Sequence, residues 1–135
     1  MSGRHISTTL RQQVRQRAAG RCEYCLVHDE DVLAPHEPDH ITAGQHGGST
    51  TSDNLAFACY HCNRFKGTNM ASLDPKTGQR VFLFDPRRDA WSHHFKLEGA
   101  EIVGLTATGR ATAAVLNFNE SDRLEFRATP IQAGR

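Results

Sequence analysis

The sequence lacks an apolar run long enough to cross a membrane, and its first residues lack the apolar stretch of a secretion signal. It also lacks a strong charge imbalance, since its net charge of +1 is far from that of a strongly basic nucleic-acid binder. Cysteine occurs only four times, always in close pairs. We therefore expect a cytoplasmic protein that does not bind membranes and keeps its cysteines reduced.

Lys and Arg are absent from residues 28–59, which carry six acidic residues. The segments on either side, residues 1–27 and residues 60–97, each have a net charge of +4. An acidic segment attracts a divalent cation, and basic flanks can hold phosphates. Charges that only solvate the surface explain the same pattern, and both interpretations stay open.

All four cysteines lie in two Cys-x-x-Cys pairs, Cys22 with Cys25 and Cys59 with Cys62. Zinc favours four thiolates in a tetrahedron, and a two-residue gap lets each pair bind from a single turn. We therefore predict a structural Zn2+ held by these four cysteines; free or disulfide-bonded cysteines are the alternative. A zinc with four protein ligands cannot activate water, so any chemistry must come from the residues around it.

The residues between and directly after the pairs include an acid beside a histidine, Asp39 and His40, and two asparagines, Asn54 and Asn63. Carboxylate and amide oxygens suit Mg2+ or Mn2+, and a neutral imidazole is a general base near pH 7. Together these groups suit the attack of water on a phosphodiester. Taken one at a time, they are better explained as a surface histidine, a turn residue and a helix cap.

This arrangement resembles the HNH endonuclease family, in its subclass with a four-cysteine zinc clasp. The resemblance covers about a third of the chain and implies an α+β fold. Its centre would be a ββα-metal core, in which a helix packs across a hairpin with a long intervening loop. The matching residues, in order, are Cys22, Cys25, Asp39, His40, Ile41, Gly47, Gly48, Asn54, Leu55, Cys59, Cys62, Asn63, Lys66 and Gly67.

The resemblance also implies a role for each matching polar residue. Asp39 and Asn63 would hold the catalytic metal, and His40 would deprotonate the attacking water. Asn54 would tie down the loop between the strands, and Lys66 falls at the family's basic position. Because the pattern reads His-Asn-Asn, the expected catalytic metal is Mg2+ or Mn2+ rather than zinc or nickel.

We expect residues 1–135 to form a single domain. The HNH core with its zinc clasp would occupy residues 20–72, and a C-terminal α/β extension of hairpin plus helix would occupy residues 73–135. In the first half of the chain we predict a helix over 8–18 capped by Thr9 and Gln12, a strand beginning near Val32 and Leu33, a loop over 42–53, a strand over 55–58 and a helix from 63 to about 71. In the second half we predict a strand over 81–84, a hairpin of 93–97 with 101–105, and a helix over 108–117.

Four basic side chains are candidate contacts for nucleic acid, namely Arg64, Lys66, Arg87 and Arg88. Three other residues have no assigned role. His61 lies between two cysteine ligands and is either exposed or a substitute for a thiolate; we expect it to be exposed. Trp91 either closes the core or touches nucleic acid, and His94 would have at most a supporting role.

We therefore predict a metal-dependent HNH endonuclease that nicks DNA. The resemblance implies products with a 5′-phosphate and a 3′-hydroxyl. We expect a monomer or weak dimer. Because a single site cuts one strand, a monomer would nick, and a double-strand break would need a dimer or two encounters. RNA remains open as a substrate. The alternatives are a non-catalytic zinc-clasped adaptor that binds nucleic acid or protein, and a purely structural zinc protein.

Overall fold

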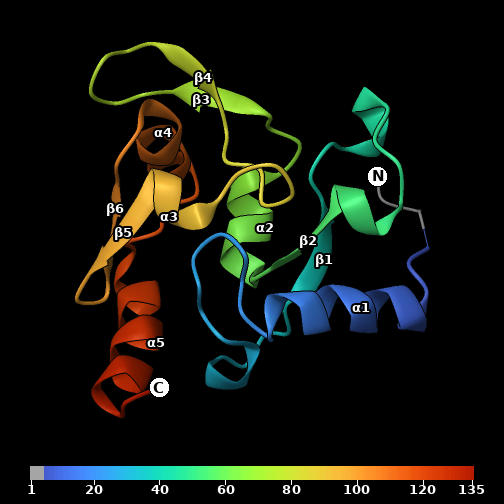
Figure 1. Ribbon diagram of the computed structural model, residues 1–135, viewed down its shortest axis with the longest axis horizontal. Helices are drawn as coiled ribbons and strands as arrows, with labels where there is room; N and C mark the ends of the chain where they lie inside the picture. The colour runs from blue at the N-terminus through green and yellow to red at the C-terminus, as the bar shows by residue number, and fades with distance from the viewer. Residues whose placement is uncertain (1–4) are drawn as a thin grey trace.

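The computed structural model describes residues 5–135. Within them, the chain has an α+β fold with three separate two-stranded antiparallel sheets among its helices (Figure 1). None of the helices in this range is long and apolar enough to span a bilayer. The main elements are α1 (Thr8–Ala18), β1 (Glu37–His40), β2 (Leu55–Ala58), α2 (Tyr60–Lys66), β3 (Ala71–Leu73), β4 (Arg80–Phe82), α3 (Trp91–His94), β5 (Phe95–Glu98), β6 (Glu101–Gly104), α4 (Ala107–Val115) and α5 (Ser121–Gln132).

Helix α1 has the predicted bounds but a different cap. Ser7, not Thr9, is the N-cap, and its hydroxyl accepts a hydrogen bond from the Leu10 N–H at 3.1 Å. The helix ends at Ala19, which adopts the left-handed conformation. Val14 is fully buried on the face that packs against β2, so α1 covers one side of the hairpin.

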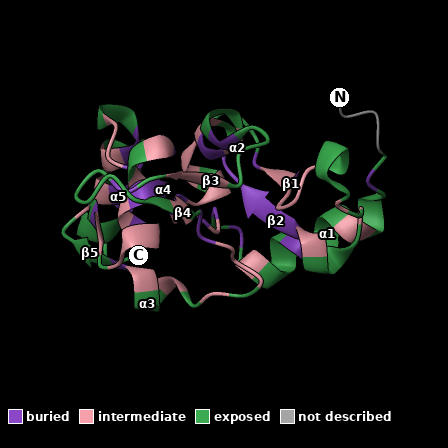
Figure 2. Ribbon diagram, turned by 90° about the horizontal axis from the view of Figure 1, so that it is seen from above, coloured by how far each residue is buried: buried purple, intermediate pink, exposed green. Residues whose placement is uncertain are grey.

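Strands β1 and β2 form the predicted hairpin, and helix α2 contacts β1. Asp39 pairs with Ala56, and His40, the last residue of β1, pairs with Leu55. Every residue of β2 is buried, as the purple strand in Figure 2 shows. The observed order of strand, loop, strand and helix is the one that the predicted ββα core requires.

Helix α2 starts and ends earlier than predicted, at Tyr60 and Lys66 instead of residues 63 and 71. It starts inside the second cysteine pair because Cys59 is its N-cap, with the sulfur accepting from the Cys62 N–H at 3.3 Å. It stops at Gly67, whose φ of 53° leaves the helical region. The predicted strand near Val32 and Leu33 is absent, and Leu33 is fully exposed.

Two predictions for the C-terminal segment need correction, and one helix was missed. The strand predicted over 81–84 is β4, in which Phe82 is exposed, while Leu83 and Phe84 are buried beyond its end. His93 and His94 lie in the short helix α3, not in a strand. Helix α5 was not predicted at all. The hairpin at Gly99 (β5 with β6) and the helix α4 are as expected.

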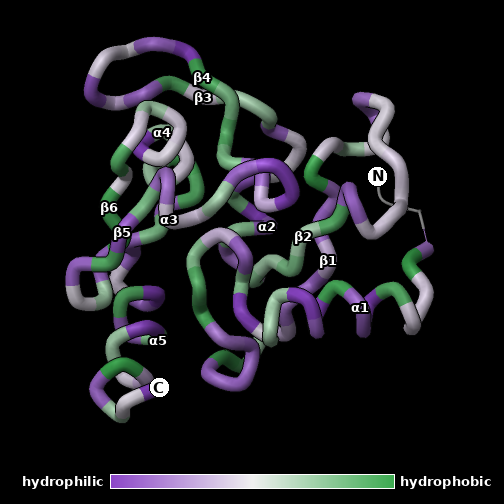
Figure 3. Tube along the Cα trace, in the orientation of Figure 1, coloured by the Kyte–Doolittle hydropathy of each residue, from purple (hydrophilic) through white to green (hydrophobic). Residues whose placement is uncertain are grey.

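The main hydrophobic core joins the two predicted parts of the chain. It contains all four cysteines and also Phe95, Ile102, Leu116 and Phe118 of the C-terminal segment. In Figure 3, the apolar segments of β6 and α4 lie on the same side of the molecule as the middle of α5. The C-terminal segment therefore packs directly on the cysteine pairs and does not form a separate core.

Candidate zinc clasp and nuclease site

The four cysteines come together in the buried core and form no disulfide bond. Their sulfur atoms all lie within 4.8 Å of one another, and the Cys25 and Cys59 sulfurs are 3.6 Å apart. Zn–S bonds of about 2.3 Å in a tetrahedron give sulfur–sulfur distances of about 3.8 Å. The cysteines are thus arranged for zinc. Within residues 5–135 no other group of three or more His, Cys, Asp or Glu is so placed, and His61 is not part of this one.

Both pairs present their sulfurs through the same local geometry. The Cys25 N–H donates to the Cys22 sulfur at 3.4 Å, just as the Cys62 N–H donates to the Cys59 sulfur. Burial raises the pKa of the Cys22 and Cys62 thiols well above the usual value. Contacts with the other cysteines lower the pKa of Cys59, and for Cys25 they outweigh burial and lower its pKa as well. Two of the four sulfurs thus favour the thiolate and two oppose it, and a bound cation would stabilise all four thiolates.

Two arginines of α5 surround this cluster. Arg123 is fully buried and donates to the Cys62 sulfur at 3.1 Å and to the carbonyls of Leu116 and Asn117. Burial disfavours its charge, yet the cysteine charges outweigh that effect and raise the pKa of Arg123. Arg127, which is 4% exposed, donates to the Cys25 carbonyl at 3.3 Å. Four thiolates with Zn2+ carry two negative charges, which these two guanidinium groups balance.

The sequence offered a signal for α5 that hydrophobic periodicity does not detect. Its inward face has helical spacing, with Arg123, Phe126, Arg127 and Pro130 buried or partly buried. Two of these positions are arginines, so in the sequence the inward face of the helix does not stand out as apolar. Cys62, the partner of Arg123, lies 61 residues away in the sequence, and Cys25, whose carbonyl accepts from Arg127, lies 102 residues away. Both are beyond the reach of any local pattern.

The second site lies at the end of β1. Asp39 is 8% exposed, and its Oδ2 lies 3.1 Å from the Nζ of Lys66, which is 3% exposed. Lys66 also donates to the His40 carbonyl at 3.1 Å. Asp39 Oδ2 is buried and has no hydrogen bond of good geometry. Burial raises the pKa of Asp39, and the Lys66 charge only partly opposes this.

The loop after β1 is folded around Asn54. The Asn54 side chain accepts from the Thr42 N–H at 2.9 Å and donates to the carbonyls of Thr42 at 3.0 Å and Ser49 at 2.7 Å. Gly48 is required here, because a Cβ at this position would lie 1.7 Å from the Thr42 oxygen. The loop returns to His40 through Thr50, whose Oγ1 is 2.9 Å from the His40 Nε2. Sequence reasoning missed Thr50, which lies in a loop without periodicity.

Asn63 occupies the middle of α2 and is partly buried. It precedes Lys66 by three residues, a spacing that puts two side chains on the same side of a helix. The structure therefore brings Asp39, His40, Asn54 and Lys66 together, with Asn63 on the helix that supplies the lysine.

The arginine candidates differ in what they contact. Arg64 is exposed and donates to the Tyr60 hydroxyl at 2.7 Å. Arg87 is ion-paired with Glu23, and burial together with nearby Arg17 lowers the pKa of Arg87 to about 10. Arg88 has 85% of its side chain exposed. Only Arg64 and Arg88 are thus presented at the surface.

Two aromatic or imidazole side chains of the C-terminal segment have structural partners. The Trp91 indole N–H donates to the Tyr24 carbonyl at 2.9 Å, and its ring packs against the main core. His94 Nδ1 lies 2.6 Å from the Thr106 hydroxyl, the N-cap of α4.

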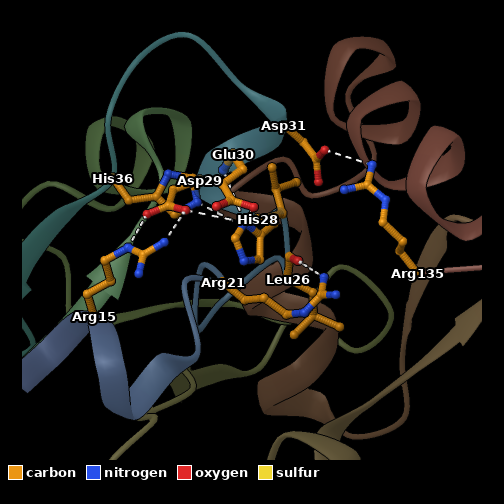
Figure 4. A network of polar contacts seen from close by, with 10 residues as sticks. Arg15, Arg21, Leu26, His28, Asp29, Glu30, Asp31, His36 and Arg135 are labelled. Atoms are coloured by element: carbon orange, nitrogen blue, oxygen red, sulfur yellow. Dashed lines mark hydrogen bonds and ion pairs between the residues drawn. The ribbon is translucent and has the colours of Figure 1, made fainter.

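The acidic segment is largely neutralised by arginines from elsewhere in the chain. Arg15 pairs with Asp29 at 2.7 Å and Arg135 with Asp31 at 3.0 Å, as Figure 4 shows. Arg11 pairs with Glu37 at 2.6 Å. These carboxylates therefore join α1 and the C-terminus to the middle of the chain, and they do not form an open cation-attracting patch.

The sequence that forms these two sites matches a known protein family. Residues 22–69 match the family model described as HNH endonuclease. These residues form an HNH domain. The matched range contains all four cysteines and each of Asp39, His40, Asn54, Asn63 and Lys66. The family is one of nucleases, so the match supports a nuclease-type function for the HNH domain.

The chain is also similar to Septu protein PtuB of Bacillus thuringiensis, with 26% identity over 108 residues. The alignment covers 78% of this chain and 39% of the relative, so the chain spans well under half of the relative's length. An alignment of that length cannot fit within residues 1–69. The similarity therefore extends beyond the HNH domain into the C-terminal segment. No solved structure matches the chain.

Proposed function

We propose that this chain is a divalent-metal-dependent endonuclease that hydrolyses phosphodiester bonds of DNA. The observation that carries the proposal is the convergence of Asp39, His40, Asn54 and Lys66 at the end of β1, inside the range that matches the HNH family. A purely structural zinc protein needs no buried acid–lysine pair beside a tethered histidine.

Asp39 and Asn63 would supply the hard oxygen ligands for Mg2+ or Mn2+. When bound, such a metal would neutralise charge on the scissile phosphate and on the leaving oxygen. Lys66 holds the Asp39 carboxylate from inside the protein, so in this arrangement it is a positioning residue and does not meet phosphate.

His40 accepts a proton from water as the water oxygen attacks phosphorus. The bond from phosphorus to the 3′ oxygen breaks, and a proton from solvent completes the 3′-hydroxyl, leaving a 5′-phosphate. Thr50 holds one nitrogen of the imidazole ring, and Asn54 holds the loop that carries Thr50. With one such site per chain, a monomer nicks one strand.

The test is nicking of supercoiled plasmid by the wild type, His40→Ala and His46→Ala, each with Mg2+, with Mn2+ and without added metal. His46 is an exposed histidine of the same loop and serves as the matched control. We expect His40→Ala to nick about 10²- to 10⁴-fold more slowly and His46→Ala to match the wild type. Equal nicking by His40→Ala would refute the assigned base. A zinc-loaded wild type that nicks with neither metal would favour the adaptor.

A further inference from the structure

The β3–β4 hairpin presents an apolar face to solvent. Phe82 pairs with Ala71 and Arg80 with Leu73, so the four side chains lie on one face of this small sheet. Phe82 is 73% exposed and Leu73 is 56% exposed. The hairpin lies beside α4 at one edge of the molecule (Figure 1), and both of its strands contact that helix. Large apolar side chains gathered on one exposed face mark interaction sites, whereas singly scattered ones do not.

The hairpin is held rigidly by its buried turn residue, Asp74. This carboxylate accepts from the Lys76 N–H at 3.0 Å and from the Thr77 hydroxyl at 2.9 Å. Arg110 of α4 adds a two-pronged contact to it, at 2.9 and 2.8 Å. The exposed face is therefore formed before any partner arrives, which reduces the entropic cost of binding.

The charge of this surface is positive. Asp74 is the only acidic residue between Met70 and Phe82, and Arg110 neutralises it inside the protein. The exposed charges of the hairpin are those of Lys76 and Arg80. Along the hairpin, Lys76 at the turn is followed by Arg80 and then by Phe82 at the foot. An aromatic ring on the same surface as two accessible cations is complementary to the negative backbone and the flat bases of a nucleic-acid strand.

The foot of the hairpin reaches the HNH site. Phe82 and Met70 line a recess of about 140 Å3 together with Ile41 and Lys66. Ile41 directly follows His40, and Lys66 contacts Asp39. A strand that enters the proposed site thus has the Phe82 face beside it.

We propose that this face, formed by Leu73, Arg80 and Phe82 with Lys76 at the turn, binds an unpaired nucleic-acid strand next to the cleavage site. A base stacks on Phe82, and Arg80 and Lys76 contact backbone phosphates. Stacking suits an unpaired base because its flat face is accessible, and it tolerates any sequence because every base has such a face. The inference rests on the proposed nuclease function and adds the form of its substrate.

The β5–β6 hairpin provides matched controls. It presents Leu97, which is 42% exposed, and Lys96, but no aromatic ring. The experiment measures fluorescence anisotropy of labelled single-stranded and duplex DNA over a range of salt, without added divalent metal so that no strand is cut. The proteins are the wild type, Phe82→Ala and Arg80→Gln, with Leu97→Ala and Lys96→Gln as controls. Thermal melting and zinc content verify that each is folded.

We expect Phe82→Ala to weaken single-strand binding about tenfold, within the range for loss of one stacked base, and to affect duplex binding less. Arg80→Gln should reduce the salt dependence by roughly one phosphate contact, a slope change of about 0.7 for single strands. The two controls should bind as the wild type does. If Phe82→Ala and Arg80→Gln also bind like the wild type, the inference is wrong and the face serves another partner, such as a protein.

A second readout separates this inference from the proposed function. Thymidine 5′-p-nitrophenyl phosphate is a small diester that does not reach the hairpin, and its hydrolysis with Mn2+ reports on the HNH site alone. We expect the wild type and the control variant Leu97→Ala to hydrolyse it equally and His40→Ala to fail. Hydrolysis by none of them would reject the nuclease function, while the binding measurements would still decide whether the hairpin holds a strand.

Discussion

The zinc clasp and the candidate nuclease site, formed by Asp39, His40, Asn54 and Lys66, lie in the same HNH domain but are built in opposite ways. The clasp is closed, because its four sulfurs are buried and two buried arginines complement their charge. The nuclease site has a buried acid with one lysine partner, and a partly exposed histidine held by a loop hydroxyl. A complete ligand set with balanced charge suits stability, whereas an incomplete one leaves room for a metal and a substrate.

The comparison also separates what each region depends on. The clasp takes residues from distant parts of the chain, since Arg123 and Arg127 come from α5. The nuclease site takes its residues from β1, the following loop and α2, all within the HNH domain. Damage to the clasp should therefore unfold the chain, while damage to the nuclease site should mostly spare the fold.

The largest expected effect is the loss of zinc. Structural zinc contributes about 10–16 kcal/mol in small zinc domains, so Cys25→Ala should lose the metal and most of the cooperative fold. Zinc analysis and thermal melting by circular dichroism measure both. His40→Ala should keep one zinc per chain and melt near the wild type. A folded, zinc-free Cys25→Ala protein would show that the clasp is dispensable.

The next effect tests the arginine that faces the clasp. Arg123→Met removes the buried charge beside Cys62 and should destabilise the protein by about 3–5 kcal/mol, the usual consequence of breaking a buried pair. Zinc should also pass faster to a coloured chelator. Arg123→Lys keeps the charge and should lose less stability than Arg123→Met. Arg88→Met, at an exposed arginine, should change neither the stability nor the rate of zinc release. Unchanged zinc release in Arg123→Met would mean that the guanidinium only packs there.

The equivalent change at the nuclease site is Lys66→Met, which leaves the Asp39 carboxylate buried without its counter-charge. Burial already raises the pKa of Asp39, and losing Lys66 should raise it further. A carboxyl group whose pKa is raised in the folded state lowers the free energy of unfolding once it has to ionise. This loss of stability is absent below the ordinary carboxyl pKa of about 4 and grows as the pH rises through the raised pKa. Thermal melts without added Mg2+ should therefore show the variant losing stability from pH 4 to pH 7 relative to the wild type. A deficit independent of pH would point to lost packing instead.

The smallest effect concerns Thr50. Thr50→Val removes the hydroxyl that holds the His40 ring, and a net hydrogen bond of about 1 kcal/mol corresponds to a roughly fivefold slower kcat. The apparent pKa of the acid limb in the pH–rate profile should move as well, and Thr50→Ser should restore both. Exposed Thr51→Val in the same loop serves as the comparison. A normal pH profile in Thr50→Val would indicate that Thr50 does not position His40.

The sequence by itself determined the clasp, the hairpin and the class of domain. Two Cys-x-x-Cys pairs need only their own turns to present sulfur, so their spacing is a local signal. Residues 55–58 form a buried strand because four apolar residues follow a turn, and α1 follows its four-residue apolar spacing. The roles predicted for Asp39, His40, Asn54 and Asn63 stay predictions, as does the single-domain organisation.

Only the tertiary structure decided the partners of the charged residues. No role was predicted for the arginines of α5, and in the structure Arg123 is buried against Cys62. Phe82 looked like part of a buried strand, yet it faces solvent while its neighbours Leu83 and Phe84 enter the core. The physical reason is the same in both cases. Side-chain spacing fixes which residues share a face, but burial of that face depends on segments far away in the sequence.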